Sequence, residues 1–134
     1  DATAAAVQAA GLGRVALLGT RYTMEDASIV QQRLRERGGL DVVVPAAADR
    51  ETVHRVIYDE LCRGIVADAS RAEFVAVIER LRAHGAEGVI LGCTEITLLI
   101  NAAASPLPLF DSTALHAQAA AEWMTRDMTT KDPR

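Results

Sequence analysis

Residues 88–96, GVILGCTEI, contain the side chains best suited to chemistry, because Cys93, Thr94 and Glu95 directly follow a short apolar run. A buried aliphatic run of this length is typical of a parallel strand. Cys93 then stands at the carboxyl end of the strand, where open α/β sheets bind their ligands. A helix should begin at once, and its free amides and dipole favour a thiolate and an anionic substrate. The sequence therefore predicts a partly ionised Cys93 thiol at the mouth of a sheet.

Each of these three residues also has a simpler interpretation. Cys93 could be a small buried hydrophobe, as most free cysteines are. Glu95 could exchange a proton with the thiol or orient a substrate ammonium group, or it could be an acidic residue favoured by the helix dipole. Thr94 could offer its hydroxyl and amide to a carboxylate, or it could cap the helix. The polar pair behind the cysteine and the position at a strand end favour the functional interpretation.

A second polar segment follows the first predicted strand, residues 14–19. Thr20 and Thr23 lie in the turn after this strand, which should face the same cleft as the end of the cysteine-bearing strand. Gly19 would allow a close approach of the backbone. Thr23 could instead cap the next helix, with Asp26 completing a capping box. The turn is therefore a candidate part of the same site.

The elements that must position these residues alternate between strand and helix. Asp49 is expected to cap one helix, and Ser70 with Glu73 to form a capping box for the next. This alternation predicts a parallel sheet with right-handed crossovers, in a flavodoxin-like, doubly wound α/β lobe of about four strands and six helices. We expect one domain over residues 1–128 and a polar tail over 129–134. Strands are predicted over 14–19, 40–45, 88–92 and 106–110, and helices over 2–10, 24–37, 49–63, 70–84, 95–100 and 111–126.

The composition restricts the classes of function. The chain has 134 residues, which suits one packed core, and it is 50% apolar without a run long enough to cross a membrane. Its net charge is −4, and thirteen of its fourteen basic residues are scattered arginines, which argues against nucleic acid as a partner. No N-terminal signal pattern is visible, and Cys62 and Cys93 have no disulfide spacing, so a cytoplasmic protein with reduced thiols is expected. No metal-ligand cluster is expected among His54, His84 and His116.

Three motifs together resemble the aspartate/glutamate racemase family. They are LLGTRYTM at residues 17–24, GCTE at 92–95 and PLFDST within 107–113. The GCTE form, with Glu where glutamate racemases carry His, is closest to the aspartate racemase branch. The resemblance covers essentially the whole chain but only the second half of such an enzyme, which is similar to two α/β lobes with a cleft between them. It implies that residues 106–126 pack on the missing first lobe, so that the last helix and Trp123 need a partner.

The chemistry that the resemblance implies is racemisation of aspartate or glutamate without pyridoxal phosphate or a metal. One base removes the α proton while a second returns a proton to the opposite face, and each lobe supplies one cysteine for this. The resemblance assigns one of these two roles to Cys93, with Glu95 as its partner. It also makes the turn that carries Thr20 and Thr23 a binding loop for the substrate carboxylate.

Other assignments remain open at this stage. Some relatives have a substrate-binding lysine near Arg63, and the register lets Cys62 or Arg63 match it. Arg63 could bind a carboxylate bidentately or lie at a solvated helix end. Residues 111–113 are expected to cap the last helix. The alternatives to a racemase are a one-cysteine decarboxylase or isomerase of small diacids, and an inactive lobe that binds a ligand or a partner. A homo-oligomer or association with a first lobe is expected.

Overall fold

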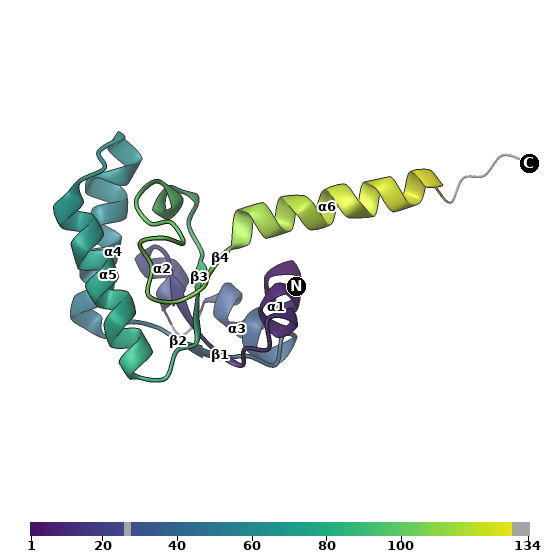
Figure 1. Cartoon of the computed structure of the whole chain (residues 1–134), viewed down its shortest axis with the longest axis horizontal. Coiled ribbons are helices and arrows are strands. Elements are labelled where there is room, and N and C mark those ends of the chain that lie inside the picture. Colours follow the sequence, from purple (N-terminus) through teal and green to yellow (C-terminus); the bar gives the residue numbers. More distant parts are fainter. Residues whose placement is uncertain (26–27, 130–134) are drawn as a thin grey trace, which may run out of the picture.

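The computed structural model of the chain describes residues 1–25 and 28–129. The described residues form one parallel sheet with the strand order β2-β1-β3-β4 (Figure 1). Its register places Leu17 beside Ile90, and Ile90 beside Phe110. The strands are β1 (Arg14–Leu18), β2 (Asp41–Val43), β3 (Gly88–Leu91) and β4 (Leu109–Asp111).

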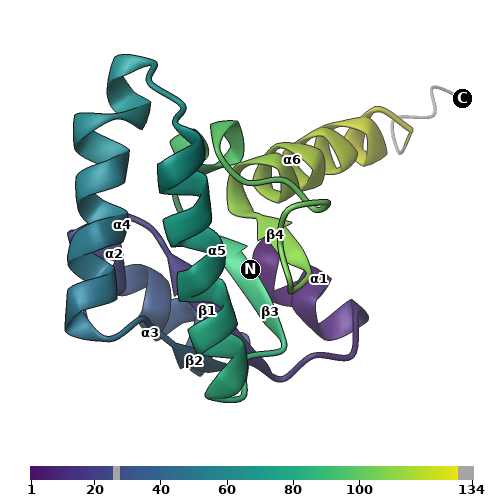
Figure 2. The same ribbon diagram turned by 60° about the vertical axis from the view of Figure 1, so that its left-hand side comes forward.

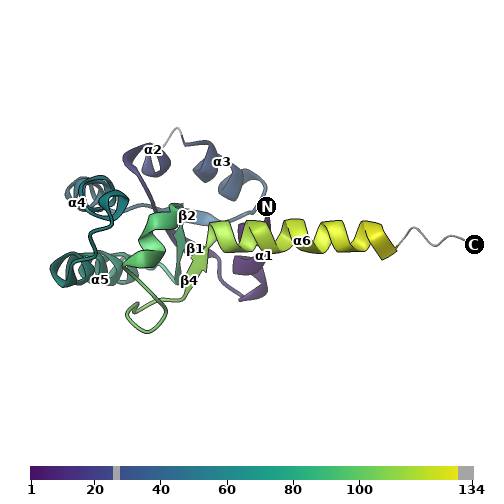
Figure 3. The same ribbon diagram turned by 90° about the horizontal axis from the view of Figure 1, so that it is seen from above.

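Helices cover both faces of the sheet, as Figure 3 shows from above. Helices α1 and α3 pack on one face, while α4 and α5 pack on the other. The predicted doubly wound, flavodoxin-like α/β fold is therefore confirmed. The helices are α1 (Ala2–Ala9), α2 (Arg21–Met24), α3 (Ile29–Glu36), α4 (Ala47–Asp59), α5 (Asp68–Ala83) and α6 (Ser112–Thr129), with 3-10 turns η1 (Leu61–Arg63) and η2 (Thr94–Leu98).

The alternation of side chains along β1 supplies both halves of the core. Val15 and Leu17 pack toward α1 and α3, whereas Ala16 and Leu18 pack toward α4 and α5. A strand buried on both faces is apolar throughout, which explains its unbroken hydrophobic run. The apolar side chains that α4 and α5 turn toward the sheet are buried: Val53, Val56 and Ile57 on α4, and Phe74, Val77, Ile78 and Leu81 on α5.

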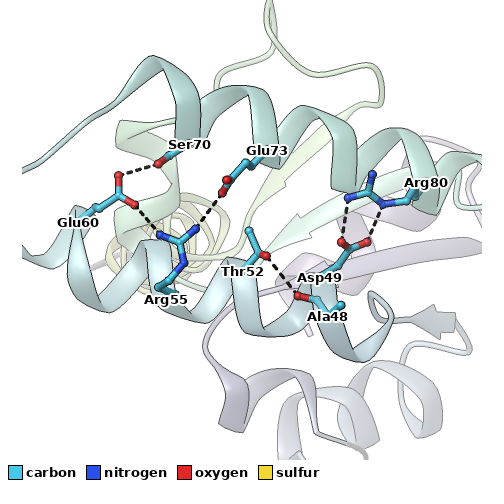
Figure 4. Close-up of polar contacts among 8 residues, drawn as sticks. All are labelled: Ala48, Asp49, Thr52, Arg55, Glu60, Ser70, Glu73 and Arg80. Carbon is cyan, nitrogen blue, oxygen red and sulfur yellow. Dashed lines mark hydrogen bonds and ion pairs between the residues drawn. The ribbon is translucent and has the colours of Figure 1, made fainter.

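Polar contacts join α4 and α5, which run side by side in opposite directions (Figures 2 and 4). Asp49 accepts two hydrogen bonds from the guanidinium of Arg80, both at 2.8 Å. The predicted cap at Asp49 is wrong, since α4 begins after Ala46 and Asp49 lies in its first turn. The predicted capping box at Ser70 is also wrong. Helix α5 begins earlier, at Asp68, and the Ser70 hydroxyl donates instead to Glu60 at 2.6 Å.

The segment after β1 differs from the prediction. The turn expected over residues 20–23 contains the short helix α2, and the helix expected from residue 24 begins only at Ile29. Ser28 caps α3 by accepting a bond from the Gln31 amide at 3.4 Å. Thr23 lies inside α2, so its alternative role as a cap is wrong, and Asp26, the other half of that capping box, lies outside the described residues.

Helix α6 extends away from the rest of the molecule (Figures 1 and 3). It contacts α1, and beyond that contact Trp123 and Met124 are 67% and 57% exposed. Of the segment 106–126 that was expected to pack on another lobe, the strand pairs with β3 inside this chain, while a contact of α6 with another lobe stays a prediction. Residues 130–134, most of the predicted polar tail, lie outside the described residues. No helix among the described residues is long and apolar enough to span a bilayer.

In this arrangement, burial in the core contributes most of the free energy of unfolding, and the exposed ion pairs contribute little. Phe74 is fully buried, so Phe74→Ala should lower the free energy of unfolding by about 3–5 kcal/mol through lost burial and a cavity. Arg55 bridges Glu60 and Glu73 with its side chain 49% exposed, so Arg55→Ala should cost less than about 1 kcal/mol. Urea unfolding of both variants measures the difference, and equal losses would contradict this account of the core.

Candidate active site at the edge of β1 and β3

The carboxyl ends of β1 and β3 bring the two predicted polar segments to one edge. The Gly92 amide donates to the Leu18 carbonyl at 2.7 Å, which continues the pairing of the strands to the residue before Cys93. A Cβ at Gly92 would lie 3.1 Å from that carbonyl oxygen and 3.1 Å from the Thr23 methyl. A Cβ at Gly19 would lie 3.0 Å from the Thr23 Cβ. The two glycines thus leave room for Thr23 against both strand ends.

The thiol of Cys93 is hydrogen-bonded to the carboxylate two residues later. Cys93 Sγ donates to Glu95 Oε2 at 2.8 Å, and the Thr94 hydroxyl donates to the same oxygen at 2.9 Å. Cys93 is the N-cap of η2, a single 3-10 segment where the sequence predicted a helix. The Thr94 hydroxyl therefore orients Glu95 in this structure and does not cap the turn.

The predicted partial ionisation of Cys93 is wrong for this chain. The pKa of the Cys93 thiol is raised to about 11, chiefly by burial and in addition by the Glu95 carboxylate, which accepts the thiol proton and adds its charge. The Glu95 amide, which belongs to the first turn of η2, lowers this pKa but does not offset the other two effects. The expected dipole effect is small because η2 has only five residues.

Glu95 has the opposite preference. The hydrogen bond from the Cys93 thiol lowers the pKa of the Glu95 carboxyl, and its own backbone amide and the Thr94 hydroxyl lower it further. The pair therefore rests as a neutral thiol bonded to a carboxylate. A neutral thiol is a proton donor, and the carboxylate beside it can hold a cationic group or accept a proton in turn.

Two side chains from other elements fix the backbone around this pair. Arg71, on α5, donates from Nε to the Leu99 carbonyl at the end of η2 at 2.8 Å. Ser112 donates from its hydroxyl to the Leu91 carbonyl, the last residue of β3, at 2.7 Å. Arg71 was not predicted from the sequence, because nothing in its local pattern distinguishes it from a surface arginine.

The expected cap of the last helix is confirmed, since Asp111 accepts from the amides of Thr113 and Ala114.

The remaining predicted binding residues lie around the same edge. The hydroxyls of Thr20 and Thr23 are 3.4 Å apart, and both side chains are half-buried. Arg63 is exposed at the end of η1, which packs against η2, and its guanidinium forms no hydrogen bond or ion pair with any described side chain. Cys62 is also exposed. Positive φ at Gly64, +76°, ends η1 and turns the chain away toward α5.

An open pocket of about 500 Å³ lies next to this edge, on the side of α1, α3 and α6. Gly92, Thr113 and His116 line it together with apolar residues of α3, so it borders the residue before Cys93. Among the residues that the structure describes, no group of three or more His, Cys, Asp and Glu could hold a metal ion.

Comparison with known proteins identifies the family to which these features belong. The sequence profile of the Asp/Glu/hydantoin racemases matches residues 1–120. The chain belongs to this family. The resemblance seen in the GCTE and LLGTRYTM motifs is thus confirmed. A protein of Pectobacterium carotovorum subsp. carotovorum, uncharacterised and encoded in the pnlA 3′ region, is 33% identical over 125 residues, which are 92% of this chain and 81% of that protein.

Solved structures support the same assignment to the racemase family. A protein of Yersinia pestis, provisionally assigned as an Asp/Glu racemase, matches with a TM-score of 0.87 and 50% identity over 92% of this chain and 53% of its own. An aspartate racemase homologue of Pyrococcus horikoshii OT3 matches with a TM-score of 0.83 and 35% identity, over 93% and 54%. The Picrophilus torridus aspartate racemase matches with a TM-score of 0.63 and 25% identity, over 89% and 50%. The chain spans about half the length of these solved relatives.

The thiol and carboxylate pair predicts an unequal reactivity of the two cysteines. At pH 7.5 iodoacetamide should alkylate the exposed Cys62 faster than Cys93, because only a thiolate reacts and the pKa of Cys93 is raised to about 11. Glu95→Gln removes a charge that raises this pKa and should speed labelling of Cys93, while labelling of Cys62 should not change. Peptide mass spectrometry measures both rates. Faster labelling of Cys93 than of Cys62 in the unmodified chain would contradict the pKa derived from the geometry.

Proposed function

We propose that this chain supplies one half of a cofactor-independent amino-acid racemase site of the aspartate or glutamate class. The observation that carries the proposal is the Cys93 thiol bonded to Glu95 at the shared edge of β1 and β3, in a chain of the racemase family. The ligand is a small acidic amino acid and not nucleic acid or a membrane. Both cysteines are free thiols, which fits a reducing cytoplasm.

The resting protonation state gives Cys93 a defined task. Inversion at the α carbon needs one group that removes the proton and another that delivers one to the opposite face. Because burial and the Glu95 carboxylate raise the pKa of the Cys93 thiol to about 11, Cys93 starts the cycle as the donor. The abstracting base then has to lie on the other face of the substrate, and another lobe or a second copy of the chain would supply it.

Substrate binding would prepare Cys93 for the reverse reaction. An α-ammonium group held by Glu95 places a positive charge beside the sulfur and offsets the effect of the carboxylate. The pKa of the thiol then falls toward the working pH, so the thiolate becomes accessible. Glu95 thus holds the substrate cation and tunes the acid that works on the carbon next to it.

The carboxylates of an acidic substrate have suitable partners around this pair. The Thr20 and Thr23 hydroxyls and the Thr94 amide can donate to one carboxylate. The guanidinium of Arg63, which has no partner among the described side chains, can bind the other carboxylate in a bidentate manner. A diacid with an α-ammonium group matches this set of donors and the Glu95 acceptor.

The neutral Cys93 thiol also favours a second candidate, a one-cysteine decarboxylase or isomerase of small diacids. Such a reaction needs a single acid to protonate a carbanion, and a thiol with a raised pKa is suited to that step. The two functions differ in whether a second base faces Cys93. A catalytically inactive lobe that binds a ligand or a partner is the third possibility, and it predicts binding without turnover.

Deuterium exchange distinguishes these functions. The chain, together with a first lobe that supplies the second base, is incubated with L-aspartate or L-glutamate in D₂O, and NMR follows label at the α carbon while chiral chromatography follows the D-enantiomer. We expect label and inversion together, with Cys93→Ser lowering the rate by at least about 10²-fold and Cys62→Ser leaving it unchanged. Label without inversion would favour one-base chemistry, and saturable binding without label would favour the inactive lobe.

A further inference from the structure

We propose that His54 positions the substrate-binding turn that carries Thr20 and Thr23, by acting as the cap of α2 from another helix. The Arg21 amide donates to His54 Nδ1 at 2.9 Å, although 33 residues separate the two in the sequence. From the sequence, His54 was expected to belong to no metal-ligand cluster, and no other role was assigned to it. The inference rests on the proposed function for the role of the turn, but the contact itself does not.

The Arg21 amide needs such a partner because α2 cannot supply one. The first amides of a helix have no acceptor inside the helix, and a side chain at the N-cap normally provides one. Thr20 is the N-cap of α2 and makes no capping bond, since its hydroxyl faces that of Thr23. His54 takes over this task. Accepting at Nδ1 requires a neutral ring that carries its proton at Nε2.

Neighbouring aromatic rings fix the orientation of the imidazole. The centroid of the Tyr58 ring lies 4.7 Å from that of the His54 ring, and the centroid of the Tyr22 ring, which meets the imidazole edge-on, lies 6.3 Å from it. One turn earlier on α4, Glu51 forms an ion pair with the Arg21 guanidinium at 3.1 Å. Glu51, His54 and Tyr58 follow helical spacing, so a single face of α4 holds α2.

Helix α4 is a rigid support, and α2 is not. On its opposite face α4 buries Val53, Val56 and Ile57 against the sheet. Helix α2 has four residues, which is too short to be stable by itself. Thr23 packs against Gly92, next to Cys93, so a displacement of α2 moves the binding hydroxyls relative to the thiol. His54 therefore couples the position of the turn to the core.

Amide exchange tests the contact without any assay of activity. By NMR, His54→Ala should speed hydrogen exchange at the Arg21 amide roughly five- to tenfold, because its acceptor is lost. His54→Asn should restore protection, since the Asn Oδ1 can occupy the place of Nδ1. The matched control is His84→Ala, which removes a ring that bonds the Arg80 carbonyl on α5 and should leave Arg21 unchanged. Unchanged exchange at Arg21 in His54→Ala would overturn the proposal, and so would equal acceleration at core amides.

The kinetics of deuterium exchange at the α carbon of the substrate test the consequence for the site. His54→Ala should raise KM for the acidic amino acid roughly tenfold and change kcat less than about threefold, because it loosens binding and leaves Cys93 in place. His54→Asn should return KM to the starting value. A loss confined to kcat, or no rescue by Asn, would contradict positioning. If the unmodified chain exchanges no label at all in the presence of the first lobe, the proposed function fails, while the Arg21 amide still decides whether His54 caps α2.

Discussion

The parallel pairing of β1 with β3 is the constraint on which the site depends. It places Leu18 beside Leu91 in register and is continued by the bond from the Gly92 amide to the Leu18 carbonyl. Both strands therefore end at the same level, and the segments that follow them meet there. Two glycines allow that meeting, because a Cβ at either position would press on Thr23. A thiol, a carboxylate and two hydroxyls thus share one edge although about 70 residues separate the two segments in the sequence.

The chemistry of Cys93 is decided by a competition between burial and local dipoles. The amide of Glu95 favours the thiolate, as the position before a helical turn suggests, but loss of water and a carboxylate at 2.8 Å oppose it more strongly. The resulting neutral thiol is suited to donating a proton. In the proposed racemisation, the ammonium group of the substrate offsets the charge of Glu95. The bound substrate therefore lowers the pKa of the thiol that acts on it.

The sequence predicted the fold well because the apolar residues of its strands and helices have regular spacing and because glycine or proline marks the ends of these elements. The strand before Cys93, predicted over 88–92, is β3 (Gly88–Leu91), and the predicted helices over 49–63 and 70–84 overlap α4 and α5. The errors lie where a contact with a neighbouring helix overrides a local signal. Asp49 and Ser70 have the residue types of helix caps, but each instead bonds a side chain on the neighbouring helix, Arg80 or Glu60. Such long-range partners leave no mark in a local pattern.

The same limit applies to the site. Sequence position alone brought Cys93, Thr94 and Glu95 together, because they are adjacent, but it could not give the ionisation state of the thiol, which depends on burial. It also missed His54 and Arg71, whose contacts with the Arg21 amide and the Leu99 carbonyl hold the two site segments from outside. Both of these bonds run from a helix packed on the sheet to the backbone of a short turn. The turns carry the chemistry and are too short to hold their own shape, so their geometry depends on the rigid helices behind them.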